Sequence, residues 1–434
     1  MNEDFLQYVW KFQHFSSHEL KCKDGQELQV LKPGIQNFNA GPDFLNARIR
    51  IGDTTWAGNI EVHINASDWY KHNHQSDPAY ENVILHVVYT ADKPVLDKSK
   101  NEIPVITLSN LIDYQTYRYY KSWVKKSNFI PCENLVQNVP DIVRIAAVQS
   151  AAVDRLQIKS ELCLDLLNST NGDIEESFYR VFCKALGLKV NAMPFEQLAI
   201  ITPFKLIRKN AKSAEDLQAL LLGQSGFLEQ ADDNAPFLKQ LKSTYLLQKQ
   251  KFGLKPMPAT AWKLFRLRPQ NFPAVRIAQL SLIYAKHRSL AQLVTEYSSV
   301  EEYVQLFESE LVSDFWRSHF TLNSESEPVT KRLGVSTIHL LIINAVVPFL
   351  FALASYNKNG SFQEKAVSLL EQLPPEKNSV ISKYETLGFT AKHAFDSQGL
   401  IGLKKSYCEQ LKCLTCKVGI QILNNHGKAY QPHL

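Results

Sequence analysis

Two carboxylates and a histidine within residues 41–74 have the types and spacing of a metal site. The stretch reads GPDFLNARIRIGDTTWAGNIEVHINASDWYKHNH, with Asp43, then 17 residues, then Glu61-Val62-His63. Alternate residues of a strand face one side of a sheet, so Glu61 and His63 project together, and Asp43 opens the neighbouring strand. Paired carboxylates suit Mg²⁺ or Mn²⁺. A cation held there can acidify a water, so we predict hydrolysis with Asp43, Glu61 and His63 as the catalytic residues.

The histidines of the same stretch allow a second kind of site. His72 and His74, together with Glu61 and His63, could bind Zn²⁺ or Fe²⁺ through mixed nitrogen and oxygen ligands. However, YKHNHQSD is also typical of an irregular surface turn, and His86 lies in an apolar strand as a core histidine would. A hard-metal site, a histidine-rich site and a merely solvated strand face all stay open here.

A separate group of cysteines lies near the C-terminus. YCEQLKCLTCKVGI (407–420) contains Cys408, Cys413 and Cys416 in a C-x4-C-x2-C array. Three thiolates need a fourth ligand to bind Zn²⁺ or an iron–sulfur cluster. We take Cys132 as that ligand, with His426 as the alternative. The alternative without a metal is that these are ordinary buried cysteines of a helical core.

The elements that would position the first site are predicted within the first 110 residues. Apolar residues at spacings of three and four predict a helix over 4–15. Alternation and Gly or Pro boundaries predict strands over 26–34, 42–51, 55–65, 83–91 and 103–111, with short helical turns between 67 and 82. We therefore predict an α+β protein whose residues 1–135 form an α/β core with a mixed sheet.

Beyond this core the periodicity becomes helical. DIVRIAAVQSAAVDRLQIKSELCLDLL and SFQEKAVSLLEQL repeat apolar residues at helical spacing. We predict an α-helical region over 136–434 that ends in the Cys-rich segment. The Pro-rich GLKPMPATAW (253–262) suggests lobes at 136–250 and 251–434.

Pro42-Asp43, Glu61-Val62-His63 and the order helix, three strands, helix, strand resemble the PD-(D/E)xK nuclease superfamily over roughly residues 1–110. This resemblance implies a restriction-endonuclease-like core that cleaves DNA or RNA with Mg²⁺ bound to Asp43 and Glu61. His63 stands where the family has its catalytic Lys. Histidine is mostly neutral at pH 7, so His63 would serve as a general base, or Lys71 or Arg48 would supply the charge.

Two further features bear on that resemblance. The family's acidic residue on the first helix would be Glu3 or Glu19. Some members fasten a helical segment to the core with an iron–sulfur cluster, to which the cysteines here are analogous although their spacing differs. Over the whole chain, phrases such as NAGPDF, GNIEVHINASDWYKHNH, RLRPQNFPAVRIAQL and YCEQLKCLTC are similar to a bacterial family known only as a domain of unknown function.

Cations and aromatic residues alternate in AWKLFRLRPQNFPAVR (261–276). Phosphates contact such cations and bases stack on such rings, so the segment could bind nucleic acid, although its aromatic residues could equally pack inward. The four cations are Lys263, Arg266, Arg268 and Arg276.

Composition and charge limit the cellular locations and the binding partners that we expect for this protein. The net charge of +5 tolerates a polyanionic partner without requiring one. Seven cysteines and an acidic N-terminal MNEDFLQYVW favour a cytoplasmic protein over a secreted one. The apolar TIHLLIINAVVPFLFALASY (337–356) contains His339, Asn344 and Pro348, so we predict a core helix and no membrane span.

The leading hypothesis from the sequence is a Mg²⁺-dependent, nuclease-like hydrolase in which metal-bound water attacks a phosphodiester of DNA or RNA. Two alternatives stay open. One is a catalytically inactive nucleic-acid-binding or scaffold protein that keeps the nuclease-like core. The other is a hydrolase or binding protein with a His-rich Zn²⁺ or Fe²⁺ site.

Overall fold

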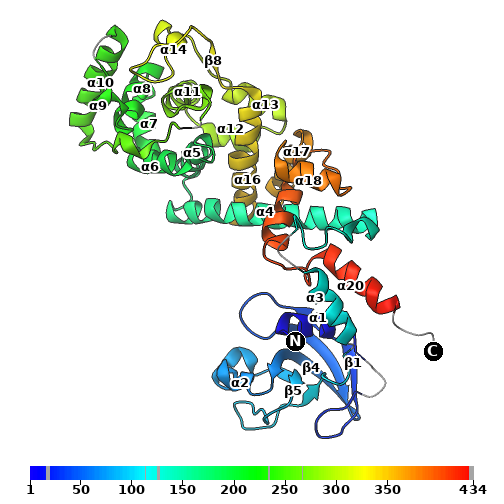
Figure 1. Ribbon diagram of the computed structural model, residues 1–434. Coiled ribbons are helices and arrows are strands. Elements are labelled where there is room, and N and C mark those ends of the chain that lie inside the picture. Colours follow the sequence, from blue (N-terminus) through cyan, green and yellow to red (C-terminus); the bar gives the residue numbers. More distant parts are fainter. Residues whose placement is uncertain (16–19, 113, 125–127, 233–234, 266, 430–434) are drawn as a thin grey trace. The chain divides into compact units, whose positions relative to one another are not determined.

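The chain folds into two compact units (Figure 1). The structure, a computed structural model, describes residues 1–15, 20–112, 114–124, 128–232, 235–265 and 267–429. Unit 1 comprises Met1–Ala147, Thr386–Phe389 and Leu403–Leu434, and unit 2 comprises Val148–Glu385 and Thr390–Gly402. The α+β class, with an N-terminal mixed sheet and a mostly helical remainder, is confirmed.

Unit 1 is built on a sheet of order β1-β3-β4-β5-β6, with the short β2 pairing with β3. The pairs β1–β3 and β3–β4 are antiparallel, whereas β4–β5 and β5–β6 are parallel. Gly52 begins the tight turn from β3 to β4 with φ +55, a conformation that glycine adopts without strain. The strands are β1 (Leu28–Lys32), β2 (Ile35–Gln36), β3 (Phe44–Ile51), β4 (Thr54–Asn65), β5 (Val83–Thr90) and β6 (Val105–Thr107).

Apolar side chains cover both faces of this sheet. On one face α1 (Glu3–Phe12) and α3 (Tyr114–Trp123) contribute to a core with β3, β4 and β5, and residues of α20 (Lys417–Ala429) join the same cluster. On the other face a smaller cluster surrounds Trp69 of α2 (Asp68–Lys71). β5 is buried on both faces, as its continuous apolar run predicts.

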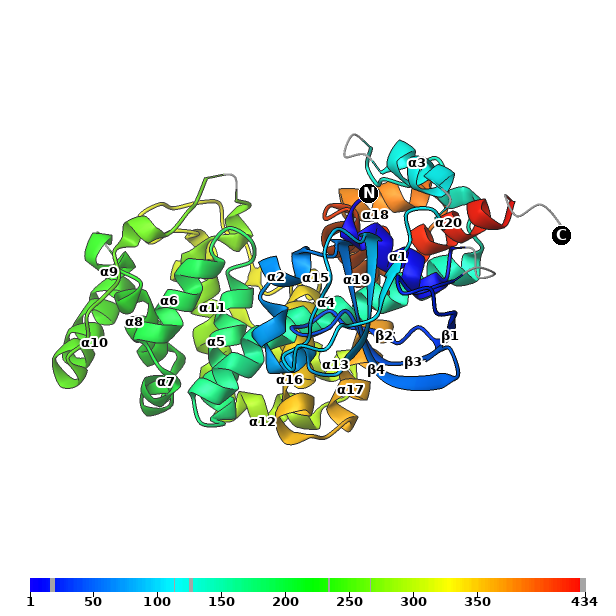
Figure 2. The ribbon, with the colours of Figure 1, turned by 90° about the horizontal axis from the view of Figure 1, so that it is seen from below.

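Unit 2 is a helical assembly around one large apolar core. Helices α5 and α6 lie side by side, as do α8 and α11 (Figure 2). Its helices are the C-terminal part of α4 (Asp141–Ser169), then α5 (Ile174–Leu186), α6 (Ala192–Ile201), α7 (Phe204–Asn210), α8 (Ala214–Gln224), α9 (Phe227–Gln230), α10 (Pro236–Phe252), α11 (Pro273–Lys286), α12 (Leu290–Glu296), α13 (Val300–Phe307), α14 (Asp314–Ser318), α15 (Val335–Leu341), α16 (Val347–Asn357), α17 (Ser361–Gln372), α18 (Ser379–Thr386) and α19 (Ala394–Gly402).

One continuous helical stretch, Val335–Asn357, is long and apolar enough to cross a membrane by length and composition alone. Its most apolar window is 78% buried inside the protein, which favours a core helix. A π-helical turn, η6 (Ile342–Val346), interrupts it and ends two residues before Pro348. Proline has no N–H to donate to the preceding turn, which accounts for this local change of pitch.

The two units differ from the domains predicted from the sequence. The first unit extends to Ala147 instead of residue 135, and it includes Leu403–Leu434 with η7 (Leu403–Cys408) and α20. Residues on both sides of position 250 belong to unit 2, so the predicted lobes share one unit.

Candidate functional site

A β-bulge interrupts the ladder between β3 and β4 close to the carboxylates. Ala47 pairs with Gly58, but Phe44 pairs with Ile60, so β3 has one extra residue in this interval. Asn46 accommodates it with a left-handed φ of +55. Asparagine tolerates this conformation better than most residues with a Cβ, which accounts locally for the bulge.

The bulge brings Asp43 opposite Glu61. In an unbroken ladder Asp43 would lie opposite Val62, whose side chain packs in the core. Phe44 and Ile60 are paired and fully buried in that core, so the residues preceding and following them belong to the other face. Two carboxylates from adjoining strands therefore meet, as predicted from their spacing.

Hydrogen bonds fix both carboxylates. The backbone N–H of Asp43 donates to Oε2 of Glu61 (3.1 Å), and the backbone N–H of Val62 donates to Oδ2 of Asp43 (3.0 Å). Gln7, on α1, donates through Nε2 to Oδ1 of Asp43 (2.9 Å). Asp43 is thus hydrogen-bonded to both α1 and β4. The other carboxylate oxygen of Glu61, Oε1, faces His63 and His74.

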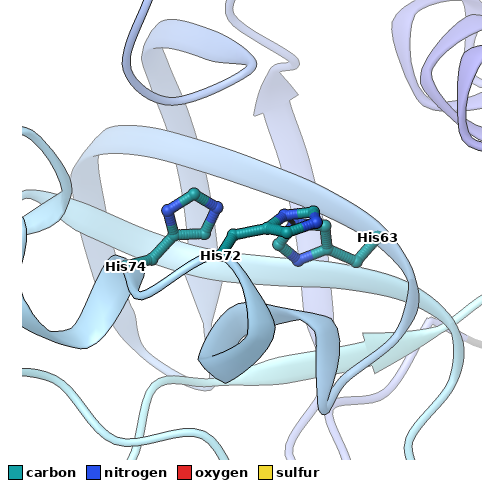
Figure 3. Close-up of side chains that lie close together, drawn as sticks. All are labelled: His63, His72 and His74. Atoms are coloured by element: carbon teal, nitrogen blue, oxygen red, sulfur yellow. Dashed lines mark hydrogen bonds between the residues drawn. The ribbon is translucent and has the colours of Figure 1, made fainter.

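Three histidines, His63, His72 and His74, lie close together (Figure 3). The donor nitrogens of His63, His72 and His74 lie within 4.8 Å of one another. His63 comes from β4, His72 follows α2, and His74 begins the short η1 (His74–Ser76). Asn73 between them has a left-handed φ of +60, which turns the chain so that both flanking imidazoles reach His63.

The distances match the ligand spacing around a single metal ion. His63 Nε2 lies 3.1 Å from Nδ1 of His72 and 3.4 Å from Oε1 of Glu61, and His74 Nε2 lies 3.3 Å from the same oxygen. Nitrogen and oxygen ligands about 2.0–2.1 Å from a tetrahedral ion are about 3.3 Å apart. His63, His72 and His74 can therefore hold a transition-metal ion, with Oε1 of Glu61 next to two of the three nitrogens.

His86, on β5, orients the central histidine. Its Nε2 lies 2.9 Å from Nδ1 of His63. For His63 to bind a metal through Nε2, its proton must sit on Nδ1 and be donated to His86, as metal-ligating histidines usually donate to a neighbour. His86 is fully buried, and its own Nδ1 has no hydrogen-bond partner in the described structure.

Burial perturbs the protonation of the whole group. It raises the pKa of Glu61 to about 8 and, with the nearby Glu61 carboxylate, that of Asp43 to about 7. Burial and neighbouring imidazoles lower the pKa of His63 to about 3. The contact between His63 and Glu61 is therefore not an ion pair at neutral pH. A divalent cation can bind to the neutral imidazoles and replace the protons of the neighbouring buried carboxylic acids.

Sequence analysis suggested Glu3 on α1 but missed the contributions of Gln7 and Lys11 on the same helix. Glu3 lies near Asp43, and its pKa rises to about 7 through burial and then through that carboxylate. Lys11 donates to Gln36, which donates to Gln7, the partner of Asp43. The signal in the sequence was a polar stripe at spacing four (positions 3, 7 and 11) on an otherwise apolar helix. Glu19, the other predicted acidic residue, lies outside the described residues.

Two aromatic rings pack against His74. Tyr80 stacks on His74 at 3.8 Å between ring centroids, and Trp69 packs at 5.4 Å from the same ring. The cations suggested as substitutes for a catalytic lysine lie elsewhere: Lys71 pairs with Asp68, and Arg48 is exposed on β3.

The four predicted cysteine ligands come together. Cys132, Cys408, Cys413 and Cys416 line one pocket of unit 1. His426, the alternative fourth ligand, stacks on Tyr119 at 3.9 Å and is not among the residues that line this pocket.

The predicted nucleic-acid residues of unit 2 do not share one surface. Lys263 and Arg268 are exposed, and Arg266 lies outside the described residues. Arg276 is only 3% exposed and donates to Gln279, Asn271 and Thr337, so it is a buried structural residue. Its guanidinium cannot contact a phosphate in this conformation, and the prediction for Arg276 is corrected accordingly.

A family model with the description "Protein of unknown function (DUF2851)" matches residues 3–379. The chain belongs to this family. The match covers the sheet, both carboxylates and all the site histidines, so the histidine group lies within the part that defines a DUF2851 protein. Searches of curated proteins and of solved structures gave no match.

Proposed function

We propose that this DUF2851 protein is a metal-dependent hydrolase of phosphodiester bonds in DNA or RNA. The observation that supports the proposal best is the grouping of His63, His72 and His74 at metal-ligand spacing. Oε1 of Glu61 lies 3.4 Å from Nε2 of His63 and 3.3 Å from Nε2 of His74. Asp43 stands beside this set as a second carboxylate, bonded through its backbone to Glu61.

The arrangement of unit 1 supports phosphodiester chemistry in particular. A first helix, three antiparallel strands, a short helix and a strand parallel to the third occur in the order that the PD-(D/E)xK resemblance implies. Glu3 on the first helix, Asp43 before β3 and Glu61 on β4 correspond to the acidic positions of that resemblance. The proximity of Glu3 to Asp43 strengthens the correspondence.

The ligand set favours a different metal from the one first expected. Three imidazole nitrogens and one carboxylate oxygen suit Zn²⁺, Fe²⁺ or Mn²⁺ better than Mg²⁺, which prefers oxygen. When bound, such an ion polarises a phosphoryl oxygen and lowers the pKa of a coordinated water. His63 then acts as a ligand, and the role of a catalytic lysine is not transferred to it.

Cleavage by variant proteins tests the proposal. Purified full-length protein, freed of metal with a chelator, is incubated with single- and double-stranded DNA and RNA and with Mn²⁺, Zn²⁺ or Mg²⁺. We expect cleavage with Mn²⁺ or Zn²⁺, reduced at least about 100-fold in Glu61→Gln, because a ligand and its charge are removed. Glu81→Gln, which changes an exposed carboxylate paired with Lys98, is the matched control.

Two outcomes would argue against the hydrolase. Cleavage that is equal in Glu61→Gln and wild type would come from a contaminant. Salt-dependent nucleic-acid binding with Mn²⁺ bound at the histidines but no cleavage of any substrate would favour the non-enzymatic alternative, a binding or scaffold protein with a nuclease-like core.

A further inference from the structure

The four cysteines that line one pocket come from two distant parts of the sequence. Cys132 lies in the segment after α3, whereas Cys408 ends η7, and Cys413 and Cys416 precede α20. The pocket is partly open to solvent. All four side chains face this one space, which ordinary packing of isolated cysteines does not require.

The thiols are close enough to influence one another. Burial raises the pKa of Cys132, and the neighbouring Cys408, Cys416 and Cys413 thiols raise it further. Cys132, Cys413 and Cys416 are buried, and Cys408 is half-buried. A cation bound among the four sulfurs would favour their thiolate forms.

The start of α20 is shaped to hold a thiolate. Burial raises the pKa of the Cys416 thiol, and the backbone N–H groups of Gly419 and Val418 partly offset this rise. Such N–H donors at a helix N-terminus stabilise negative charge on sulfur. A Cβ at Gly419 would lie 2.1 Å from the carbonyl oxygen of Cys413, so only glycine permits this close approach of the helix to the C-x2-C turn.

The spacing of the sulfurs distinguishes between metals. Among the residues that the structure describes, the histidine group has its ligand atoms within 4.8 Å of one another, and the four cysteines form no such group. With Zn–S bonds near 2.3 Å, tetrahedral zinc would hold its sulfurs about 3.8 Å apart. A cubane cluster carries one thiolate on each iron and so separates the sulfurs more widely.

We propose that Cys132, Cys408, Cys413 and Cys416 bind a cubane iron–sulfur cluster that ties the C-terminal segment of unit 1 to the segment around Cys132. A cubane in its 2+ state holds two Fe²⁺, two Fe³⁺ and four sulfides, which an assembly system or chemical reconstitution must supply. Its ligands are different residues from those of the histidine site. Evidence against the cluster would therefore not count against the proposed hydrolase, and the reverse also holds.

Metal analysis of the full-length protein tests the cluster. Protein purified anaerobically and reconstituted with Fe²⁺, Fe³⁺ and sulfide should absorb broadly near about 400 nm and contain about four irons and four sulfides per chain. Cys132→Ser and Cys408→Ser should each lose most of the absorbance. Cys163→Ser, which changes a buried cysteine in unit 2, should keep it.

Cys408 is half-buried, so its serine variant should fold, and circular dichroism checks this. Wild-type protein without iron after reconstitution would overturn the proposal, as would a cluster that survives in folded Cys408→Ser. One Zn²⁺ per chain, lost from the same two variants, would overturn the cluster in favour of a zinc site.

Discussion

The Nε2 atom of His74 lies 3.3 Å from Oε1 of Glu61, although His74 follows a loop and Glu61 lies in the middle of the sheet. This nitrogen is buried and has no hydrogen-bond partner in the described structure. A buried polar atom without a partner costs free energy. An ion bound between the two atoms would satisfy both, so this contact is a direct geometric argument for a metal at the histidine group.

Removing His74 should weaken metal binding at this site. His74→Ala deletes one of four ligands, and we expect roughly 100-fold weaker Mn²⁺ binding or more, because even supporting residues change affinity by about 10–100-fold. Electron paramagnetic resonance of free Mn²⁺ measures the affinity without interference from the cysteines, which prefer softer ions. His339→Ala, in unit 2, is the control. Equal affinity in the two variants would exclude His74 as a ligand.

Removing His86 should weaken metal binding through its effect on His63. His86→Phe keeps a buried ring but leaves the Nδ1 proton of His63 without its acceptor. We expect metal affinity to fall by about 10–100-fold while the metal-free protein stays folded. Mn²⁺ titration together with circular dichroism checks both points. Unchanged affinity in folded His86→Phe would show that His86 is only a core residue.

The bulge at Asn46 should be necessary for the site. Asn46→Val places a β-branched residue at φ +55, which costs about 1–2 kcal/mol and favours an unbulged ladder with Asp43 opposite Val62. We expect lower stability and lost metal binding in Asn46→Val, whereas Asn46→Gly should keep both. Urea unfolding measures the stability of both variants, and Mn²⁺ titration measures their metal binding. Full metal binding by Asn46→Val would contradict this role of the bulge.

The metal-free protein should lose stability as the pH rises. The pKa of Glu61 is about 8 in the folded chain against an ordinary 4.5, so between these values the unfolded chain binds fewer protons and the free energy of unfolding falls with pH. Glu61→Gln lacks this titration. It should match wild type near pH 4 and be more stable near pH 8, by an amount on the order of a few kcal/mol.

Urea unfolding of chelator-treated wild type and Glu61→Gln at several pH values measures that difference. Both proteins keep the buried histidines, so effects of histidine protonation cancel in the comparison. A stability difference that does not change with pH would mean that Glu61 is not held in its protonated form in the folded, metal-free chain.

Local patterns were sufficient to predict the strands and the meeting of Asp43 with Glu61. The hairpin turn at 52–54 and the alternation in β4 give the neighbouring strands and put Glu61 and His63 on one face. The bulge at Asn46 was not predictable, because a single asparagine within an alternating strand does not distinguish a bulged ladder from a regular one.

Non-local contacts account for what the sequence did not predict. The segment with His72 and His74 has the composition of a surface turn, and only its contacts with His63 and Glu61 on β4 show that its imidazoles belong to the site. Similarly, the C-terminal segment belongs to unit 1 because α20 packs into its core, so a division of the sequence into consecutive domains could not find it.

A crystal of full-length protein soaked with Mn²⁺ and measured at the manganese absorption edge tests the central claim most directly. We expect an anomalous peak about 2.0–2.3 Å from Oε1 of Glu61 and from the facing nitrogens of His63, His72 and His74. The same crystal without a peak among these four residues, although Mn²⁺ is bound elsewhere or not at all, would contradict the metal site and the hydrolase built on it.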